Sequence, residues 1–418
     1  MKNYDVVIIG GGPAGLAAGI KAYDYGAKVL IIEREEITGG ILNQCIHNGF
    51  GLTRFKESLS GPEYASRFIE QVAKRDIDVL TETTVLSIDK NNKTVTAINS
   101  KEGIFEVNAK AIVLAMGCRE RSKGALNIAG SRPSGLYSAG TAQKYVNIKG
   151  YLPGKEVVIL GSGDIGLIMA RRMTLEGATV KAVCEIMPYS SGLKRNIVQC
   201  LDDFGIPLYL SHTIVDIEGK DRVTAVTICQ VDQNKKPIKG TEKRFECDTV
   251  LFSVGLIPEN ELAKDAGIEL NRLTKGATVY QNRETTSSGI FACGNVLHVH
   301  DLVDFVSEEA EIAGISAAQY ALNGAKEHDS VDCIAGDNVS YVLPQMIDKN
   351  LSGAVKLFFR VRKSLNNCKV KVCVGDKTVI ETKKRVVRPG EMEHVLIAED
   401  KIKSLDGNVT VSIEGCEL

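Results

Sequence analysis

The fold is decided by the stretch Asp5-Val6-Val7-Ile8-Ile9-Gly10-Gly11-Gly12-Pro13-Ala14-Gly15. Its first five residues form a mostly apolar run of strand length, and the glycines that follow predict a tight turn. A helical pattern then ends near Gly26, and a second apolar run, residues 28–32, stops at Glu33. The order strand, glycine turn, helix, strand, acid is typical of a βαβ unit that binds a dinucleotide.

Each part of this unit has a physical reason. Gly10 permits the tight turn, Gly12 lets the backbone approach a pyrophosphate, and Gly15 lets the helix lie close to the strand. The start of the helix offers free N–H groups and the positive end of its dipole to the phosphates. Glu33, which lies 18 residues after Gly15, can accept hydrogen bonds from a ribose. We therefore expect a dinucleotide at this turn.

A second copy of the unit lies in mid-chain. An apolar run leads into Gly161-Ser162-Gly163-Asp164-Ile165-Gly166, and a strand over residues 179–184 ends at Glu185. Two complete units predict two nucleotides, bound by two domains. The carboxylate of Glu185 favours a free ribose 2′-hydroxyl and repels a 2′-phosphate, so the second site should prefer NAD(H) to NADP(H). Lys194 and Arg195 are close enough along the chain to leave NADP(H) as an alternative.

The 418-residue chain has an ordinary globular composition, with 44% hydrophobic and 25% charged residues. Its 51 Lys and Arg balance 52 Asp and Glu, so no basic excess favours nucleic acid or an anionic membrane surface. The longest apolar runs fall short of a transmembrane helix, and the N-terminus leads directly into a strand, which leaves no room for a signal peptide. The eleven cysteines show no framework spacing, so we expect reduced thiols in the cytoplasm.

Three further segments support a resemblance to a known family. Residues 111–117, 249–255 and 289–295 are short apolar runs that end in Gly or Gly-Asn. With the two glycine units they resemble the FAD/NAD-linked flavoproteins of the pyridine nucleotide–disulfide oxidoreductase class. The resemblance implies FAD on the first unit and NAD(H) on the second. That class usually has Asp where this chain has Asn295, but an amide can still hydrogen-bond a ribityl hydroxyl.

The two motifs and the resemblance together imply a set of cofactor-binding residues. For FAD these are Gly10, Gly12, Pro13, Ala14, Gly15, Glu33, Arg34, Gly40, Gln44, Val85, Ala115, Gly117, Gly294 and Asn295. For NAD(H) they are Gly161, Gly163, Asp164, Ile165, Gly166, Glu185 and Gly255. Relatives that use NADH commonly carry Glu shortly after the third glycine, where this chain has Leu167 and Ile168. This departure leaves open a second nucleotide that is structural or is not NAD.

The disulfide reductases of the class carry two cysteines close to the flavin, and this chain has no such pair. Cys45 has no second thiol nearby, and no cysteine lies between Cys118 and Cys184. Because a dithiol relay needs a resolving partner, we do not expect a disulfide reductase. The candidate catalytic residues are Cys45, Gln44 and His47. Cys45 is either a redox thiol tuned by His47 or a small buried residue, and Gln44 is a candidate for hydrogen bonding to the flavin.

The segment His298-Val299-His300-Asp301 contains three potential metal ligands. The two histidines are only two residues apart, however, and no further His or Cys follows at metal-site spacing. We therefore expect no metal. The segment is expected to contact the flavin or a partner, or to lie on the surface.

The expected fold is α/β, with two Rossmann-like dinucleotide-binding domains and a small C-terminal β-sandwich. The FAD domain is discontinuous, over residues 1–117 and 286–332, and the NAD domain of residues 118–285 is inserted in it. Short strand-like runs separated by Gly, Asn, Asp and Pro predict the sandwich over residues 333–418. We expect it to be an assembly module, with a lid on the FAD domain as the alternative.

Periodicity within the FAD domain predicts its other elements. Residues 53–75 and 304–324 are expected to be helices, and residues 79–115 carry β-strand patterns. The second helix should pack back onto the FAD domain through a buried face that carries Val306, Ala310, Ile312, Ala313 and Ile315.

Residues 40–47, 132–143 and 161–172 carry a narrower resemblance. They resemble the alpha subunits of opine oxidase and related amino-acid dehydrogenases, and flavoproteins that accompany anaerobic glycerol-3-phosphate or 2-hydroxyglutarate dehydrogenases. The resemblance implies an oligomer in which the flavin exchanges electrons with NAD(H) and with a second flavoprotein dehydrogenase subunit or a small redox partner. Two alternatives stay open: a single-cysteine NADH oxidase or peroxidase that uses Cys45, and a non-catalytic scaffold with structural nucleotides.

Overall fold

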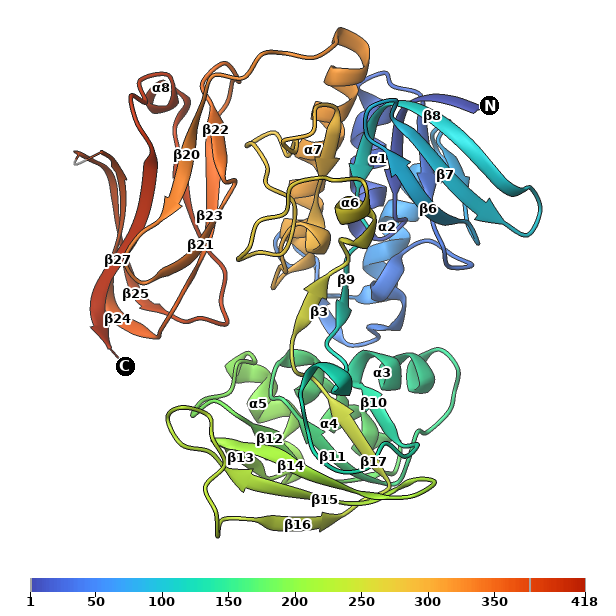
Figure 1. The fold of residues 1–418 in the computed structure, drawn as a ribbon, viewed down its shortest axis with the longest axis vertical. Helices are drawn as coiled ribbons and strands as arrows, with labels where there is room; N and C mark the ends of the chain where they lie inside the picture. The colour runs from blue at the N-terminus through green and yellow to red at the C-terminus, as the bar shows by residue number, and fades with distance from the viewer. Residues whose placement is uncertain (1, 376, 418) are drawn as a thin grey trace. The chain divides into compact units, whose positions relative to one another are not determined.

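The computed structural model describes residues 2–375 and 377–417. The chain forms two compact units, Met1–Cys118 with Pro258–Leu418, and Arg119–Ile257. Both are mixed α/β structures, and the blue and orange parts of the ribbon in Figure 1 belong to the first unit. Among the described residues, no helix is long and apolar enough to span a bilayer.

A parallel sheet forms the centre of the first unit. Its strand order is β5 (Asp78–Leu80), β2 (Val29–Ile32), β1 (Lys2–Ile9) and β8 (Gly103–Leu114), and β19 (Ile290–Ala292) pairs with β8. The Val, Ile and Leu residues of β1 and β2 are buried, as the apolar runs in the sequence predict. Beyond β8 the sheet continues antiparallel through β7 (Thr94–Asn99) and β6 (Thr84–Asp89), so the β-pattern expected over residues 79–115 is confirmed.

Two helices pack tightly against each other beside this sheet (Figure 1). They are α1 (Pro13–Asp24) and α7 (Val303–Asn323), and the prediction of a helix at 304–324 is confirmed. A side chain at Gly314 would lie 2.2 Å from the backbone oxygen of Ala18, so the close approach requires glycine there. The buried alanines of α7 belong to the same hydrophobic core as Val6, Ile8 and Ile31.

The prediction of a helix at residues 53–75 is wrong for residues 53–60, which are not helical. The helix α2 (Gly61–Ala73) begins only after Ser60, whose hydroxyl caps it in a capping box with Glu63. Residues 53–60 form turns and the short strand β4 (Leu59–Ser60), which pairs with β3 (Asn48–Phe50). Because the apolar periodicity also runs through residues 53–60, it does not mark where the helix begins. The cap at Ser60 does.

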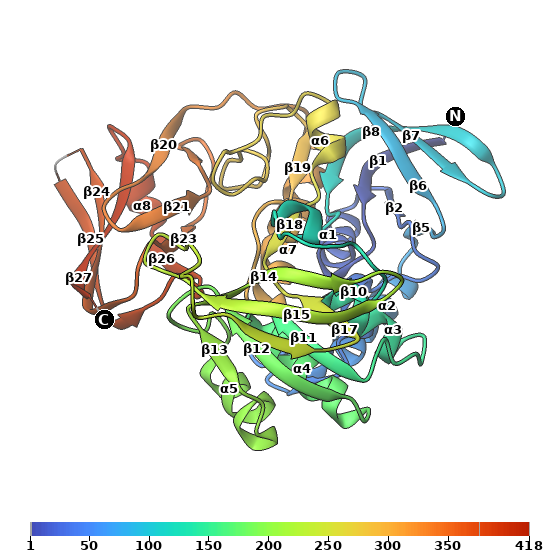
Figure 2. The same ribbon diagram turned by 60° about the horizontal axis from the view of Figure 1, so that its bottom comes forward.

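The second unit contains its own parallel sheet. The order is β10 (Leu136–Ser138), β17 (Thr249–Phe252), β11 (Glu156–Leu160), β12 (Thr179–Glu185) and β13 (Leu208–Leu210). The helix α4 (Asp164–Leu175) packs on it, together with α3 (Ala139–Asn147) and α5 (Lys194–Cys200). An antiparallel sheet of β14 (His212–Gly219), β15 (Val223–Gln230) and β16 (Lys243–Glu246) completes the unit. Figure 1 labels all three strands, and Figure 2 shows β14 and β15 from a second direction.

The boundary of the inserted domain differs from the prediction. The second unit ends at Ile257, and residues 258–285, expected in the NAD domain, belong to the first unit. The reason is burial: Ala263, Ala277 and Val279 lie in the same hydrophobic core as the central sheet of the first unit. This segment includes the short helix α6 (Glu261–Asp265).

The C-terminal part is the predicted β-rich domain with a core of its own. One sheet has the order β22 (Met346–Asp348), β20 (Ser330–Ala335), β27 (Val409–Glu417), β24 (Leu365–Val374) and β25 (Lys377–Val387). The other contains β21 (Val339–Leu343), β23 (Val355–Val361) and β26 (Glu393–Ile397), and α8 (Glu399–Ile402) is a short helix. Because β20 starts at Ser330, the domain begins slightly before the expected residue 333.

Hydrogen bonds attach this β-rich domain to the rest of the first unit. The Gln345 side chain accepts from the backbone N–H of Val279 at 2.9 Å, and the Gln281 amide exchanges two hydrogen bonds with the backbone of Asp348 at 2.6 and 2.8 Å. Arg360 on β23 forms an ion pair with Asp301. The domain therefore contacts segments on both sides of β19, and its role as an assembly module or as a lid stays a prediction.

Candidate functional site

The first glycine turn joins β1 to α1 and has the geometry that the sequence predicts. Gly10 has a φ of +107°, and a side chain there would lie 2.4 Å from the backbone oxygen of Ala115. A side chain at Gly15 would lie 1.8 Å from the backbone oxygen of Gly10. At Gly12, by contrast, the nearest atom would be 3.9 Å away. The fold itself therefore requires Gly10 and Gly15, whereas Gly12 keeps space free for a ligand.

The start of α1 suits an anion. Its first residue is Pro13, which has no N–H, and the following Ala14, Gly15 and Leu16 carry no charge. The helix dipole and the backbone N–H groups at this end therefore face no competing carboxylate from the first turn. This arrangement fits the pyrophosphate of FAD.

Glu33 holds the turn from the end of β2. Its side chain is buried, and its two oxygens accept hydrogen bonds from the backbone N–H groups of Gly11 at 2.7 Å and Glu35 at 2.8 Å. Each carboxylate oxygen keeps a second lone pair for a ribose hydroxyl. The neighbouring Arg34 is exposed. The predicted acid is thus placed at the turn, where it also orders the backbone.

The segment after β2 returns to the glycine turn. The N–H of Gly39 donates to Gly11 O at 2.8 Å, and a side chain at Gly40 would lie 3.0 Å from the Cα of Gly12. The short helix η1 (Gly40–Gln44) follows and leaves Gln44 buried. The expected residue Gly40 is therefore close to the first turn, and Gln44 ends the short helix that starts there.

Cys45 and His47 follow η1. The Cys45 Sγ donates to Ile41 O at 3.3 Å, and burial raises the pKa of this thiol to about 12. The ring of His47 lies 5.0 Å from that of Phe50. Because a nucleophilic cysteine must be a thiolate, the neutral Cys45 thiol argues against the oxidase or peroxidase that would use it.

The segment after β19 reaches the same edge of the sheet. A side chain at Gly294, whose φ is +73°, would lie 2.8 Å from the Cβ of Ala14 in the first turn of α1. Asn295 Oδ1 accepts from the backbone N–H of His300 at 3.0 Å. Gly117 follows β8, the strand next to β19, with a φ of +74°. Ligands of open α/β sheets bind at this carboxyl edge.

Two further residues expected to bind FAD lie on or directly after strands of the central sheet. Ala115 lies directly after β8, and its N–H donates to Ile9 O at 2.9 Å. Val85 lies on β6, opposite Ala97 of β7, and packs against the core that contains Val7 and Leu30. A contact of Val85 with FAD stays a prediction.

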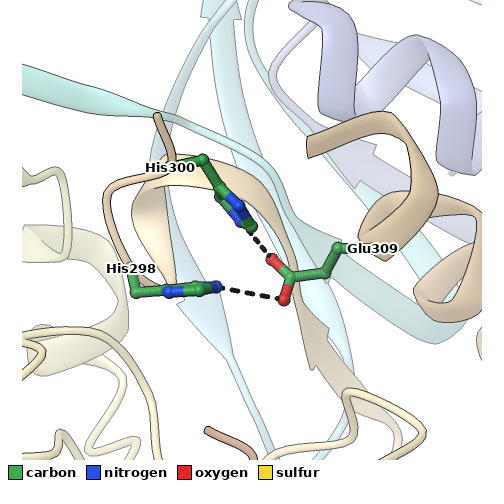
Figure 3. Close-up of side chains that lie close together, drawn as sticks. All are labelled: His298, His300 and Glu309. Carbon is green, nitrogen blue, oxygen red and sulfur yellow. Dashed lines mark hydrogen bonds and ion pairs between the residues drawn. The ribbon is translucent and has the colours of Figure 1, made fainter. Parts of the chain in front are cut away.

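A cluster that the sequence did not predict lies beside this segment: Arg283, His298, His300 and Glu309, called here the Glu309 cluster. Figure 3 shows three of its members, His298, His300 and Glu309. Glu309 Oε1 accepts from Arg283 Nε at 3.0 Å and from His298 Nε2 at 3.3 Å. Its Oε2 accepts from His300 Nε2 at 3.0 Å and from the N–H of Gly294 at 2.9 Å. The signal available in the sequence was a glutamate on the alanine-rich face of a buried helix.

The protonation of the cluster follows from its burial. Burial lowers the pKa of His298 to about 4, so this ring is neutral at pH 7 and donates through Nε2–H. Burial by itself raises the pKa of Glu309, but His300, His298 and Arg283 outweigh burial and hold its pKa well below the usual range. Glu309 is therefore a carboxylate that pairs with the Arg283 guanidinium.

His298, His300 and Glu309 have the donor atoms of a metal site. Two features disfavour an ion. The Arg283 guanidinium already neutralises the carboxylate, so a divalent cation would leave an excess of buried positive charge. A metal-bound histidine also donates its other N–H to an acceptor, and both Nδ1 atoms are buried without a hydrogen-bond partner in the described chain. The cluster fits a hydrogen-bonded role better.

The second glycine turn repeats the geometry of the first. Gly161 has a φ of +104°, and a side chain there would lie 1.9 Å from Ser253 O. A side chain at Gly166 would lie 2.4 Å from Gly161 O, whereas at Gly163 the nearest atom would be 3.7 Å away. Glu185 accepts from the N–H and the hydroxyl of Ser162, at 3.0 and 2.8 Å. The acid of this site, too, orders its turn.

Asp164 is the first residue of α4, and its carboxylate is held by a neighbouring segment. Oδ1 accepts from the N–H of Leu193 at 2.8 Å and from the Asn196 amide at 2.7 Å. Ile165 is partly buried beside it. Gly255 follows β17 with a φ of +103°. All the residues expected for NAD(H) lie in the second unit.

The chain belongs to the pyridine nucleotide-disulphide oxidoreductase family, whose sequence pattern matches residues 4–311. It is similar to an opine oxidase subunit of Agrobacterium tumefaciens (strain Ach5), with 24% identity over 344 residues that cover 77% of this chain and 66% of the relative. It is also similar to the NADH oxidase of Methanocaldococcus jannaschii, with 27% identity over 330 residues that cover 75% and 66%. The matches span just under two thirds of these relatives.

Among solved structures, the thioredoxin reductase of T. acidophilum superposes with a TM-score of 0.63 at 24% identity. The superposition covers 77% of this chain and all of that one, and at this identity it shows the fold alone. The predicted class, the two-domain fold and the cofactor pair of FAD and a nicotinamide dinucleotide are confirmed.

Proposed function

We propose that this chain binds FAD at the first glycine turn and NAD(H) at the second, and that it exchanges hydride between them. The observation that supports this most is the repetition of one design: a required glycine at each end of the turn, a middle glycine with open space, and a buried acid at the end of the next strand. FAD, when bound, supplies the ring that accepts or gives the hydride. The protein residues bind and orient the two nucleotides.

We infer that the chain is not a disulfide reductase. The eleven cysteines, all within the described residues, form no disulfide, and Cys45 is the only one between residues 33 and 117. Its raised pKa also disfavours a thiolate. A test is the NADH-dependent reduction of a small aromatic disulfide beside that of a dye. Dye reduction without disulfide reduction supports the proposal, and comparable rates with both contradict it.

We further propose that the electrons pass to or from a partner, either a second flavoprotein dehydrogenase subunit or a small redox protein, within an oligomer. The support is the similarity to a relative that is named as one of the subunits of opine oxidase. Cysteines that form no disulfide favour a reducing compartment, the cytoplasm. Purification of the tagged protein from its own cell, followed by identification of the co-purified flavoprotein, tests this step.

Anaerobic addition of NADH to the purified protein tests the central proposal. We expect the visible absorbance of the flavin to bleach on mixing, and to bleach more slowly with NADPH if Glu185 contacts the ribose as proposed. A protein that contains FAD but keeps its absorbance with both nucleotides would instead be the non-catalytic scaffold.

A further inference from the structure

We propose that Glu309 is a positioning residue for FAD: it fixes the backbone of residues 294–300 against the first glycine turn and thereby sets the affinity for the cofactor. The inference rests on the proposed FAD site. It concerns a residue far from both glycine motifs in the sequence.

The first step is the position of Gly294. This residue follows β19 at the carboxyl edge of the sheet, and its Cα approaches Ala14 so closely that a side chain would clash at 2.8 Å. Its φ of +73° places the backbone in a region that favours glycine. The N–H of Gly294 donates to Glu309 Oε2 at 2.9 Å. Glu309 therefore holds the residue that forms one wall at the start of α1.

The second step is Asn295, which is expected to contact the ribityl chain. Its Oδ1 accepts from the backbone N–H of His300 at 3.0 Å. The ring of the same His300 donates to Glu309 Oε2 at 3.0 Å. Glu309 thus controls the Asn295 side chain through His300, in addition to the direct bond to Gly294.

The Glu309 cluster is shielded from water by the β-rich domain. Phe358 of the β-rich domain packs on both histidine rings, with centroid distances of 5.8 Å to His298 and 6.1 Å to His300. Glu309 is fully buried and Arg283 is 2% exposed. Since water is kept away from these charges, each hydrogen bond of the carboxylate has few competitors. The C-terminal domain thereby contributes to the FAD site as a cover.

Two double variants distinguish the loss of the hydrogen-bond acceptor at position 309 from the loss of the Arg283–Glu309 ion pair. In Arg283→Met with Glu309→Gln, the guanidinium is removed and position 309 still offers an oxygen to Gly294 and His300. In Arg283→Met with Glu309→Met, the same charge is removed and the acceptor is lost. We expect the first variant to bind FAD within about twofold of the parent, and the second to bind at least about tenfold more weakly. Fluorescence titration of the apoproteins with FAD measures the difference.

Glu308→Gln is the matched control, because Glu308 is the adjacent residue of α7 and pairs with Lys356 at the surface. It should leave FAD affinity unchanged. Circular dichroism of each apoprotein checks folding. If the methionine variant does not fold, His300→Phe keeps a ring and removes the bond to Glu309, and it should still weaken FAD binding severalfold and shift the visible flavin spectrum.

The outcomes are distinguishable. If the parent protein binds no FAD, the proposed function is wrong. If the parent binds FAD and the two folded double variants bind it equally, or if His300→Phe leaves both affinity and spectrum unchanged, Glu309 has no positioning role.

Discussion

The two glycine turns of this chain share their geometry but differ in charge at the start of the helix. In the first, α1 starts with Pro13 and its first turn is uncharged. In the second, α4 starts with Asp164, whose carboxylate accepts hydrogen bonds from Leu193 and Asn196. The turn glycines and the strand-end acids Glu33 and Glu185 correspond in both.

Comparing the two turns shows which residues the fold requires and which residues affect the bound nucleotide. Gly10 and Gly161 are required in both turns because a side chain would collide with the backbone of the neighbouring strand end. The charge at the helix start can vary between the two turns because the turn backbone does not depend on it, although it changes the attraction of the helix end for an anion. We expect the uncharged first site to retain its nucleotide tightly, and the second site, with its own carboxylate, to bind and release a nucleotide that is exchanged in each turnover.

The largest effect on nucleotide binding should come from replacing the middle glycine of each turn, Gly12 or Gly163, by valine. Gly12→Val and Gly163→Val each add a branched side chain where a Cβ makes only ordinary van der Waals contacts, at 3.9 and 3.7 Å, and at backbone angles that valine tolerates. Gly12→Val should yield folded protein with almost no bound FAD, whereas Gly163→Val should keep its FAD and lose reduction by NADH. Visible absorbance and anaerobic titration measure both. If Gly12→Val keeps full flavin absorbance, the assignment of the first site is wrong.

A smaller effect is expected at the acid of the second site. Glu185→Ser removes the carboxylate that we predict to face the ribose, so the preference for NADH over NADPH should narrow by about tenfold. The measurement is the rate of flavin reduction with each nucleotide. Glu185 also accepts a hydrogen bond from Ser162, so Glu185→Gln, which keeps one acceptor oxygen, is the matched control. Its preference for NADH over NADPH should lie between that of the parent and that of Glu185→Ser. Equal rates with NADH and NADPH in the parent protein would contradict the predicted preference.

Asp164 tests the charge difference directly. Asp164→Asn keeps an oxygen for Leu193 and Asn196 and removes the negative charge at the start of α4. The dissociation constant for NADH should fall about two- to fivefold, as expected for one charge at a helix end. Calorimetric titration at low and high salt checks this, since the gain should shrink as salt rises. Weaker binding would show that the carboxylate itself contacts the nucleotide.

The smallest effect is expected at Cys45. Hydride exchange needs no thiol, and the pKa of about 12 keeps Cys45 neutral throughout the usual assay range. Cys45→Ser should therefore retain most of the NADH–dye activity, with an unchanged pH profile between about pH 6 and 9. Loss of dye reduction in a variant that still binds FAD would make Cys45 an essential redox group.

The sequence alone was sufficient for the local units. The glycine turns, the strand-end acids and the helix at 304–324 were predictable because each depends on backbone geometry or periodicity within about 30 residues. The β-rich C-terminal domain was predictable from its short strand-like runs. The start of α2 was not, because apolar periodicity continues across residues 53–60 while the cap at Ser60 decides where the helix begins.

Only the tertiary structure decided which distant residues share one environment. Residues 258–285 follow the second unit along the chain, yet they join the first because their apolar side chains complete its core. Arg283, His298 and Glu309 come from a loop, a turn and a helix, and they meet because α7 packs on α1 through alanines and Gly314. A buried charge is tolerated only beside its partner, and the pairing of Glu309 with Arg283 exists only after the chain has folded.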